Sequence, residues 1–132
     1  MKKILSALVF AICILSVNFC SAYDYDSDRN YKFIAKISGH KYYLYLPSVE
    51  VQEYNPPHYQ IAGYFAGDSD FDTVIRYNWY TKETFTRNAY YGNWKKDDLN
   101  VTGRYRIEMI TFANALFRVA YGMDFYVKGE DY

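Results

Sequence analysis

The sequence predicts an α+β fold, an antiparallel sheet of about five to six strands with one C-terminal α-helix packed on one face. Between Tyr31 and Tyr91, apolar and polar residues alternate in short runs separated by turn formers, as in half-buried strands. From Arg104 to Tyr121, apolar residues recur instead at every third or fourth position, as in an amphipathic helix. No repeat or linker divides the chain, so we expect a single domain over residues 31–132.

The individual strands are predicted from alternation and from turn residues. Tyr31–Ile37 alternates cleanly, and Tyr42–Leu46 begins the returning strand of a hairpin. Pro47 has no backbone N–H to donate, so strand pairing should pause there. The consecutive prolines Pro56 and Pro57 predict a firm break without pairing. The further strands that we expect are Tyr59–Ala66, Asp72–Tyr80, Glu83–Tyr91 and a short edge strand over Met123–Val127.

The predicted C-terminal helix carries two apolar stripes. The first consists of Met109, Phe112, Leu116 and Val119, and the second of Ile110, Phe117 and Tyr121. The polar residues expected to face water are Arg106, Glu108, Thr111, Asn114 and Arg118. Asn100 or Thr102 should cap the start, and Gly122 stands where a left-handed C-cap residue is expected. Burial of the first stripe would contribute roughly 6 to 12 kcal/mol before entropy, so Leu116→Asp should prevent folding.

The N-terminal segment, residues 1–22, is predicted to be a cleaved signal peptide. Lys2 and Lys3 form a basic start, Ile4–Val17 is an uncharged apolar run, and small residues precede cleavage before Tyr23. The apolar run is shorter than the about 20 residues that a membrane span needs. A retained N-terminal anchor is the alternative. We therefore expect an exported protein, in the periplasm or at the cell surface, with no membrane span after cleavage.

Cys20 introduces a further alternative, because bacterial lipoproteins are cut just before a lipidated cysteine. Asn18 and Phe19 stand where that processing favours a small residue, which disfavours lipidation. Cleavage after Ala22 would leave 132 − 22 = 110 residues and remove both Cys13 and Cys20. The mature chain would then have no disulfide, thiolate metal site or cysteine nucleophile.

The composition of the mature chain points away from nucleic acid. Without Lys2 and Lys3 it carries 13 basic and 15 acidic groups with interspersed signs, whereas nucleic-acid binding needs clustered Lys and Arg. All 17 tyrosines lie after the predicted signal peptide, and tyrosine suits both half-buried strands and adhesive surfaces. The acidic segment Tyr23–Asn30 has no hydrophobic period, so we expect a flexible N-terminus there.

Candidate chemistry is sparse. His40 and His58 are the only histidines, and neither has a carboxylate at ligand spacing in the local sequence. Asp68, Asp70 and Asp72 alternate and would suit a hard cation such as calcium. Thr73 and Trp79 stand where the calcium-loop pattern has Gly and Glu, so we favour an Asp-rich hairpin turn over a metal site. No nucleophile elbow, phosphate loop or paired-histidine motif occurs in the mature chain. We expect no catalytic residues, no cofactor and no enzymatic activity.

The remaining candidate site is the face of the sheet that the helix leaves open. On the fourth strand, Ile75, Tyr77 and Trp79 should face the core, which sends residues of opposite parity to solvent. The predicted binding residues are Arg76, Asn78, Tyr80 and, from neighbouring strands, Arg87 and Tyr64. Tyrosine and arginine are favoured in binding hot spots. The alternative is that the tyrosines pair across strands as packing residues.

The order of these elements resembles the surface-adhesin protein E type of domain found in bacteria of the Gram-negative type. The resemblance lies in the strand YKFIAKI, the tyrosine-led KYYLYLPSVEV, further Tyr-rich strands, a loop with Trp94 and a C-terminal helix. Tyr42, Tyr43, Ser48 and Val49 match parts of the family pattern, but Leu46 and Pro47 stand where it has an aspartate. The resemblance implies a non-enzymatic domain and, for the family's namesake, binding to host matrix proteins and haem.

These observations favour an exported, non-enzymatic, adhesin-like binding domain that uses the open face of the sheet. Its partner would be a protein or an envelope or host component. The alternative is an inhibitor of a cell-wall enzyme, which would use the protruding segments Gly67–Asp72 and Asn93–Gly103.

Overall fold

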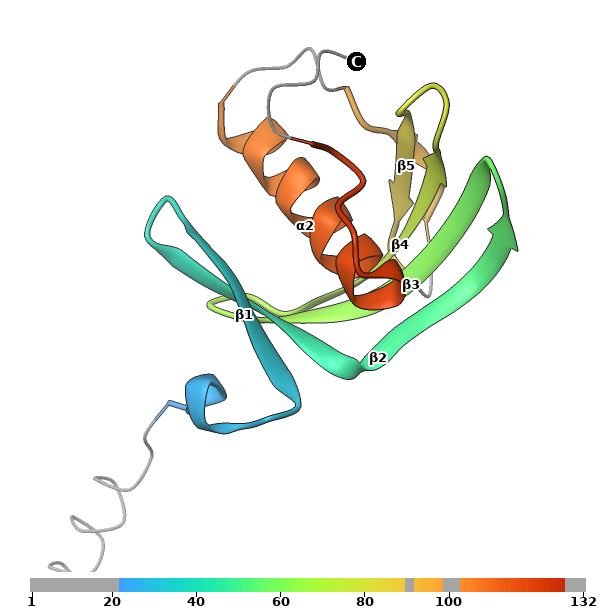
Figure 1. The fold of residues 1–132 in the computed structure, drawn as a ribbon. Coiled ribbons are helices and arrows are strands. Elements are labelled where there is room, and N and C mark those ends of the chain that lie inside the picture. The colour runs from blue at the N-terminus through green and yellow to red at the C-terminus, as the bar shows by residue number, and fades with distance from the viewer. Residues whose placement is uncertain (1–21, 90–91, 99–102, 128–132) are drawn as a thin grey trace, which may run out of the picture.

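A six-stranded antiparallel sheet and one long helix make up the fold (Figure 1). The structure is a computed structural model that describes residues 22–89, 92–98 and 103–127, so the predicted signal peptide lies outside it up to residue 21. The strands pair in chain order: β1 Tyr31–Ile37, β2 His40–Asn55, β3 His58–Gly67, β4 Phe71–Asn78, β5 Thr84–Arg87 and β6 Lys95–Lys96. A short 3-10 helix, η1, spans Tyr25–Ser27, and the helix α2 spans Arg104–Tyr121. The predicted fold class is confirmed.

The predicted pause in strand pairing at Pro47 is present. The register between β2 and β3 shifts between Tyr45 and Glu50, which leaves the residues around Pro47 outside the ladder. The Ser48 hydroxyl fills the gap, because it donates to the Tyr45 carbonyl at 2.6 Å and accepts from the Tyr64 N–H at 2.8 Å. A side chain thus satisfies backbone groups that the interrupted ladder would leave unpaired.

The observed strands differ from the predicted ones in several details. Pro56 and Pro57, joined by a cis peptide bond, form a two-residue hairpin turn, and Asn55 pairs with His58 across it, so pairing reaches the prolines. The predicted fifth strand is shorter, and a brief sixth strand follows in a segment expected to be a loop. The segment Met123–Val127 forms no strand.

The helix lies across the concave side of the curved sheet (Figure 1). Its deepest residues are Phe112, Leu116 and Phe117, so Phe117 belongs to the core more than the stripe analysis predicted. Leu116 is 0% exposed and sits over Gly63 of β3, where an added Cβ would lie 2.4 Å from Leu116 Cδ2. Glycine at this position lets the helix approach the sheet closely.

The two ends of α2 are capped differently. Gly122 adopts the left-handed conformation and donates its N–H to the Arg118 carbonyl at 2.7 Å, as predicted. Gly103 occupies the N-cap position and forms no side-chain capping bond. The predicted caps Asn100 and Thr102 lie outside the described residues.

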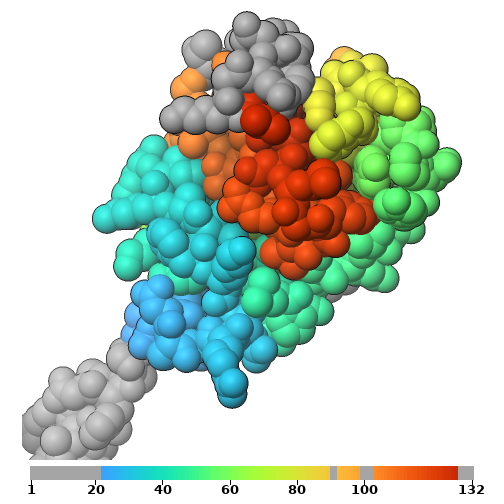
Figure 2. All heavy atoms as spheres, viewed as in Figure 1, coloured from blue at the N-terminus to red at the C-terminus, as the bar shows by residue number. Residues whose placement is uncertain are grey.

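The chain after the helix closes the core. Phe125 and Tyr126 are buried, and Figure 2 shows this segment beside the turn between β4 and β5. Asn114, expected to face water, instead pairs with the Tyr126 backbone through its amide group. The apolar residues of this segment therefore plug the end of the core rather than extend the sheet.

The inward parity predicted for β4 and the residue after it is confirmed. Ile75 and Tyr77 are buried beneath α2, and Trp79 packs against the same cluster. The buried Tyr77 hydroxyl donates to the Ala113 carbonyl at 2.9 Å, which joins the sheet to the helix. Within the described residues, no helix has both the length and the apolar character needed to cross a membrane.

Candidate binding face

Strand register sends one row of side chains to the face of the sheet opposite α2, called the outer face below. Residues directly opposite each other on antiparallel strands project from the same face. Because Ile75 packs beneath α2, its neighbour Arg76 projects from the outer face. The row that Arg76 shares across four strands consists of Gln60, Arg76, Phe85 and Lys96. Arg87 lies one row away, opposite Val74.

Trp94 gathers two arginines on this face. The Arg76 guanidinium carbon lies 3.9 Å from the centroid of the Trp94 ring, and that of Arg87 lies 4.7 Å from it. Both distances fall within the range of cation–π attraction. The predicted binding residues Arg76 and Arg87 are therefore brought together. We refer to Arg76, Arg87 and Trp94 as the Arg–Trp cluster.

A chain of amide groups positions Arg76. Its Nε donates to Gln60 Oε1 at 2.8 Å, and Gln60 Nε2 donates in turn to Gln52 Oε1 at 2.6 Å. This relay runs from β4 through β3 to β2, so three strands define where the guanidinium lies. A side chain held in this way loses little further conformational freedom when a ligand binds.

Arg87 is less well satisfied than Arg76. It is half-buried, and its Nε is shielded from solvent without any hydrogen-bond acceptor. Neither Arg76 nor Arg87 forms an ion pair with a carboxylate in the described part of the chain. Lys96, in the same row as Arg76, is by contrast paired with Glu83 at 2.6 Å. Arg76 and Arg87 thus lack an anionic partner among the described residues.

The other three predicted binding residues do not belong to the Arg–Trp cluster. Asn78 ends β4, and its Oδ1 accepts from the Tyr80 and Thr81 N–H groups at 3.1 and 3.2 Å, so it stabilises the following turn. Tyr80 is in that turn and is 82% exposed. Tyr64 is on the outer face but at its opposite end, against Tyr45. The five predicted residues do not form one surface.

Tyrosines pack together at the β1 end of the outer face. The rings of Tyr25 and Tyr43 stack at 5.0 Å, and Tyr31 contacts both Tyr25 and Tyr45 at 4.9 and 5.0 Å. Burial, followed by its hydrogen bond to Asp70, raises the pKa of Tyr64 to about 12. The alternative interpretation, that tyrosines serve as cross-strand packing, describes this end of the sheet.

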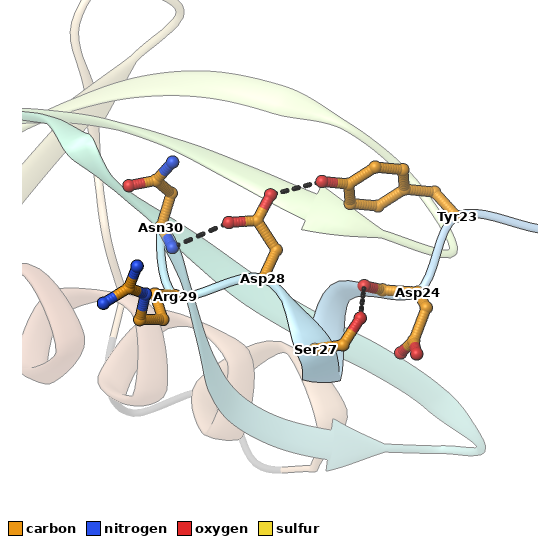
Figure 3. A pocket seen from close by; sticks show the side chains of 6 residues that line it. All are labelled: Tyr23, Asp24, Ser27, Asp28, Arg29 and Asn30. Carbon is orange, nitrogen blue, oxygen red and sulfur yellow. Dashed lines mark hydrogen bonds between the residues drawn. The ribbon is translucent and has the colours of Figure 1, made fainter.

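The segment expected to be a flexible N-terminus contributes to this packing. Its 3-10 helix lies on the sheet, and Tyr43 donates to Asp26 at 3.1 Å, so the segment packs against the sheet. A polar hollow of about 740 Å³ lies beside it (Figure 3). Its carboxylates are already engaged, since Asp24 accepts from the Asp26 N–H and Asp28 from Tyr23 and the Asn30 N–H. They serve as acceptors within the segment.

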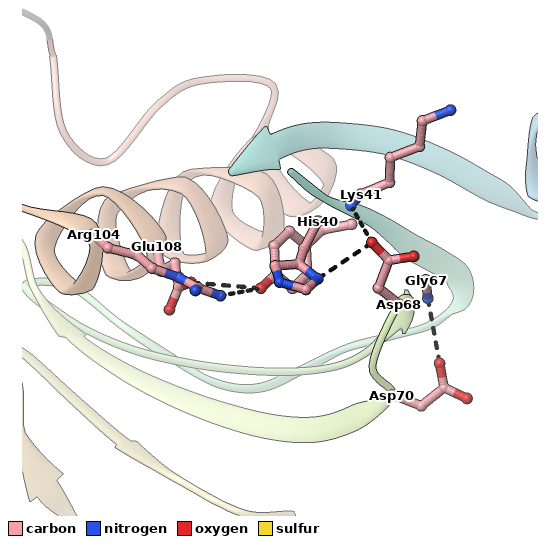
Figure 4. A network of polar contacts seen from close by, with 8 residues as sticks. His40, Lys41, Gly67, Asp68, Asp70, Arg104 and Glu108 are labelled. Atoms are coloured by element: carbon pink, nitrogen blue, oxygen red, sulfur yellow. Dashed lines mark hydrogen bonds and ion pairs between the residues drawn. The ribbon is translucent and has the colours of Figure 1, made fainter. Parts of the chain in front are cut away.

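The structure does not bring together the three carboxylates predicted as a weak metal site. Asp68 accepts from the Lys41 N–H at 3.0 Å, and Asp70 accepts from the Gly67 N–H at 3.3 Å (Figure 4). Asp72 lies on β4 opposite Tyr64. In the described ranges, no group of three or more His, Cys, Asp or Glu side chains is arranged to hold a metal ion. Asp68 and Asp70 act as hydrogen-bond acceptors at this turn, in line with the hairpin-turn interpretation of the sequence.

His40 has a carboxylate neighbour that the local sequence did not reveal. Its Nδ1 lies 3.4 Å from Asp68 Oδ2, and both side chains are 51% exposed (Figure 4). Beside this pair, Arg104 is bound to Glu108 and also donates to the Tyr42 hydroxyl at 3.4 Å. No Ser, Thr or Lys nucleophile is hydrogen-bonded to His40 among the described contacts. The pair links the start of β2 to the turn between β3 and β4.

An aromatic groove lies at the other end of α2. It is lined by Tyr54, Tyr59, Trp79, Phe117, Tyr121 and Met123 and has a volume of about 250 Å³. Ligand pockets for small molecules usually measure about 300 to 1,000 Å³, so this groove is smaller than such a pocket. Phe117 and Trp79 also stack within the core, which gives the groove a structural role.

Comparisons with known proteins add no relative. No family model matches the chain, and neither the curated proteins nor the solved structures contain a match. The resemblance to surface-adhesin protein E domains thus stays a hypothesis drawn from the sequence. The candidate site is defined by the geometry of the Arg–Trp cluster alone.

Sequence reasoning found two members of the cluster and missed the third. Trp94 was recognised only as the large apolar anchor of a loop, because its position over β4 and β5 depends on the pairing of β6 with β5. Gln60 was missed for a similar reason, since its role comes from lying opposite Arg76 in the register. The available clue in the sequence was Trp94 itself, a large aromatic residue in an otherwise polar segment, directly before Lys95 and Lys96.

Proposed function

We propose that the chain is an exported, non-enzymatic binding domain whose contact surface is the outer face of the sheet at the Arg–Trp cluster. The observation that carries the proposal is that Arg76 and Arg87 both lie over the Trp94 ring without a carboxylate partner in the described chain. Arginine and tryptophan are the residues most often found at energetic centres of protein interfaces. The predicted signal peptide supports a location outside the cytoplasm.

The arrangement favours binding over catalysis. Arg76 is held by the Gln60 and Gln52 relay, but among the described residues no histidine or carboxylate is hydrogen-bonded to the cluster to act as a general acid or base. A preorganised cation on an aromatic ring instead suits recognition of a partner's surface. The inhibitor alternative draws less support, because Asp68 and Asp70 of the protruding turn already accept hydrogen bonds from the Lys41 and Gly67 N–H groups.

The test begins with the native host. Cell fractionation and mass spectrometry of the N-terminus establish the compartment and whether the chain starts at Tyr23. Purified mature protein is then tested for binding to envelope fractions and to host matrix proteins, with the double variant Arg76→Ala, Arg87→Ala beside it. Arg106→Ala removes an exposed arginine from α2 and serves as the control. Equal binding by the double variant and the control would show that the face is the wrong one.

A further inference from the structure

We infer that the Arg–Trp cluster is a carboxylate-binding site that receives an acidic side chain of a protein partner. The inference rests on the proposed function and adds to it the chemistry of the ligand. Its starting point is an imbalance in the structure. Two positive charges share one ring, and the described part of the chain supplies neither with an anion.

The Nε of Arg87 lacks a hydrogen-bond acceptor in the described part of the chain. A buried N–H without an acceptor carries a desolvation cost, and the cost is greater for a charged group. Arg87 Nε is such a donor. Because this nitrogen is closed to solvent, an incoming carboxylate would reach Arg87 through its terminal nitrogens, where charge-assisted hydrogen bonds to a guanidinium are strong.

Arg76 complements this donor in a different way. Its Nε is occupied by Gln60, so its terminal nitrogens are the donors left for a ligand. Because the relay fixes the plane of this guanidinium, these nitrogens are presented in a defined direction. Guanidinium groups bind carboxylates in planar, two-pronged geometry, for which a fixed orientation is an advantage.

Charge repulsion adds a third argument. The guanidinium carbons lie 3.9 and 4.7 Å from the same ring centroid, so they are at most 8.6 Å apart. Like charges within this distance disfavour each other, and a bound anion near both would offset that repulsion. The Trp94 ring reduces the repulsion in the free protein but does not neutralise either charge.

The surroundings favour a protein as the source of the carboxylate. Phe85 stands between Arg76 and Lys96 in the same row and is half-buried, so an apolar surface adjoins the cations. Arginine beside tryptophan and phenylalanine is the composition of protein-binding hot spots. In the row that Arg76 shares with Lys96, the lysine is already neutralised by Glu83, so the arginine carries the unpaired positive charge of that row. A peptide carboxylate with neighbouring apolar groups fits this pattern better than an acidic polysaccharide.

The test uses a hexaglutamate peptide, with tryptophan fluorescence as the readout. Trp79→Phe leaves Trp94 as the single tryptophan, since the chain has two. We expect saturable binding at low salt that weakens with ionic strength. Arg76→Gln and Arg87→Gln should each weaken binding by about tenfold or more, and Arg106→Gln should leave it unchanged. Circular dichroism and thermal unfolding establish that each variant is folded. Arg76→Gln is the decisive variant if Arg87→Gln unfolds, because Arg76 is exposed.

Three results would overturn the inference. The first is no binding of hexaglutamate at millimolar concentration, and the second is equal binding by the Arg76 and Arg106 variants. The third is tighter binding of an oligogalacturonate, which carries the same carboxylates on a polysaccharide and would remove the assignment to protein. If the partner found in the envelope or matrix assay still requires Arg76 and Arg87, the proposed function stands without this ligand. If that assay is insensitive to both arginines, the proposed function itself fails.

Discussion

The hydroxyl of Tyr77 on β4 donates to the carbonyl of Ala113 in the middle of α2, across a distance of 2.9 Å. Tyr77 is fully buried, and burial raises the pKa of its hydroxyl well above the usual value, so the group stays a neutral donor. Aromatic contacts with Phe117 and Phe125 hold the ring in place. One side chain thus joins the sheet, the helix and the segment that follows the helix.

Removal of the Tyr77 hydroxyl should leave the packing of the ring unchanged and eliminate one buried hydrogen bond. We expect Tyr77→Phe to lower the free energy of unfolding by about 1 kcal/mol. Urea denaturation followed by circular dichroism measures the change. Tyr80→Phe, at a tyrosine that is 82% exposed, is the matched control and should be neutral. An equal effect of the two substitutions would contradict the role assigned to the bond.

Gly63 and Leu116 define how closely the helix approaches the sheet. An added Cβ at Gly63 would lie 2.4 Å from Leu116 Cδ2, so Gly63→Ala should destabilise the protein by about 1 to 3 kcal/mol. Leu116→Ala alone should cost about 2 to 5 kcal/mol through the cavity that it leaves. In the double variant the alanine methyl occupies part of that cavity, so the two costs should not add. Chemical denaturation of all four proteins measures the coupling.

Leu116→Asp is the stronger version of the same experiment. It places an unpaired charge where exposure is 0%, and we expect it to prevent folding. A cooperative thermal transition in this variant would show that Leu116 is not buried between the helix and the sheet. Arg106→Asp, on the exposed side of α2, is the control for a new carboxylate on the same helix.

Local patterns predicted the elements well. The bounds of α2 follow from apolar spacing between Arg104 and Tyr121, because a helix is specified by neighbours three and four residues apart. The outward position of Arg76 follows from alternation along one strand. The pause at Pro47 follows from its missing N–H group. Each of these inferences depends on a few consecutive residues.

Contacts between distant segments account for what the sequence did not predict. The apolar alternation of Met123–Val127 is compatible with an edge strand or with a plug, and the choice depends on the space left beneath the end of α2. Trp94 reaches Arg76 because a two-residue strand docks on β5. Asp68 meets His40 across the neighbouring turns. These placements depend on strand register, which composition and spacing do not determine.

Asp97 should make stability fall with rising pH over part of the acid range. It is 4% exposed, and burial raises its pKa above the ordinary 3.8, although Thr84, Thr86 and Tyr105 donate to it and oppose the shift. Below 3.8 the group is protonated in both states and carries no penalty. As pH rises through the raised pKa, the Asp97 carboxyl ionises more readily in the unfolded state than in the folded state. The stability that this group contributes at low pH is then lost.

The measurement compares thermal unfolding of the wild type and Asp97→Asn between pH 3 and pH 7. The stability of the wild type minus that of the variant should decrease from about pH 3.8 upward and then level off, since only the wild type titrates at this position. Asp98→Asn controls for the loss of one negative charge at an exposed neighbour. A difference that increases with pH would mean that the hydrogen bonds outweigh burial.

The final prediction concerns Asn114, whose amide holds the chain that follows the helix. Its Nδ2 donates to the Tyr126 carbonyl at 3.0 Å, and its Oδ1 accepts from the Tyr126 N–H at 2.8 Å. Asn114→Ala removes both bonds and should lower the free energy of unfolding by about 1 to 3 kcal/mol. Hydrogen exchange at the Tyr126 amide should accelerate more than at β3, because the loss is local. Asn114→Asp keeps the acceptor and removes the donor, so it should slow that exchange relative to Asn114→Ala. If Asn114→Ala exchanges like Arg106→Ala at this amide, Asn114 does not hold the segment in place.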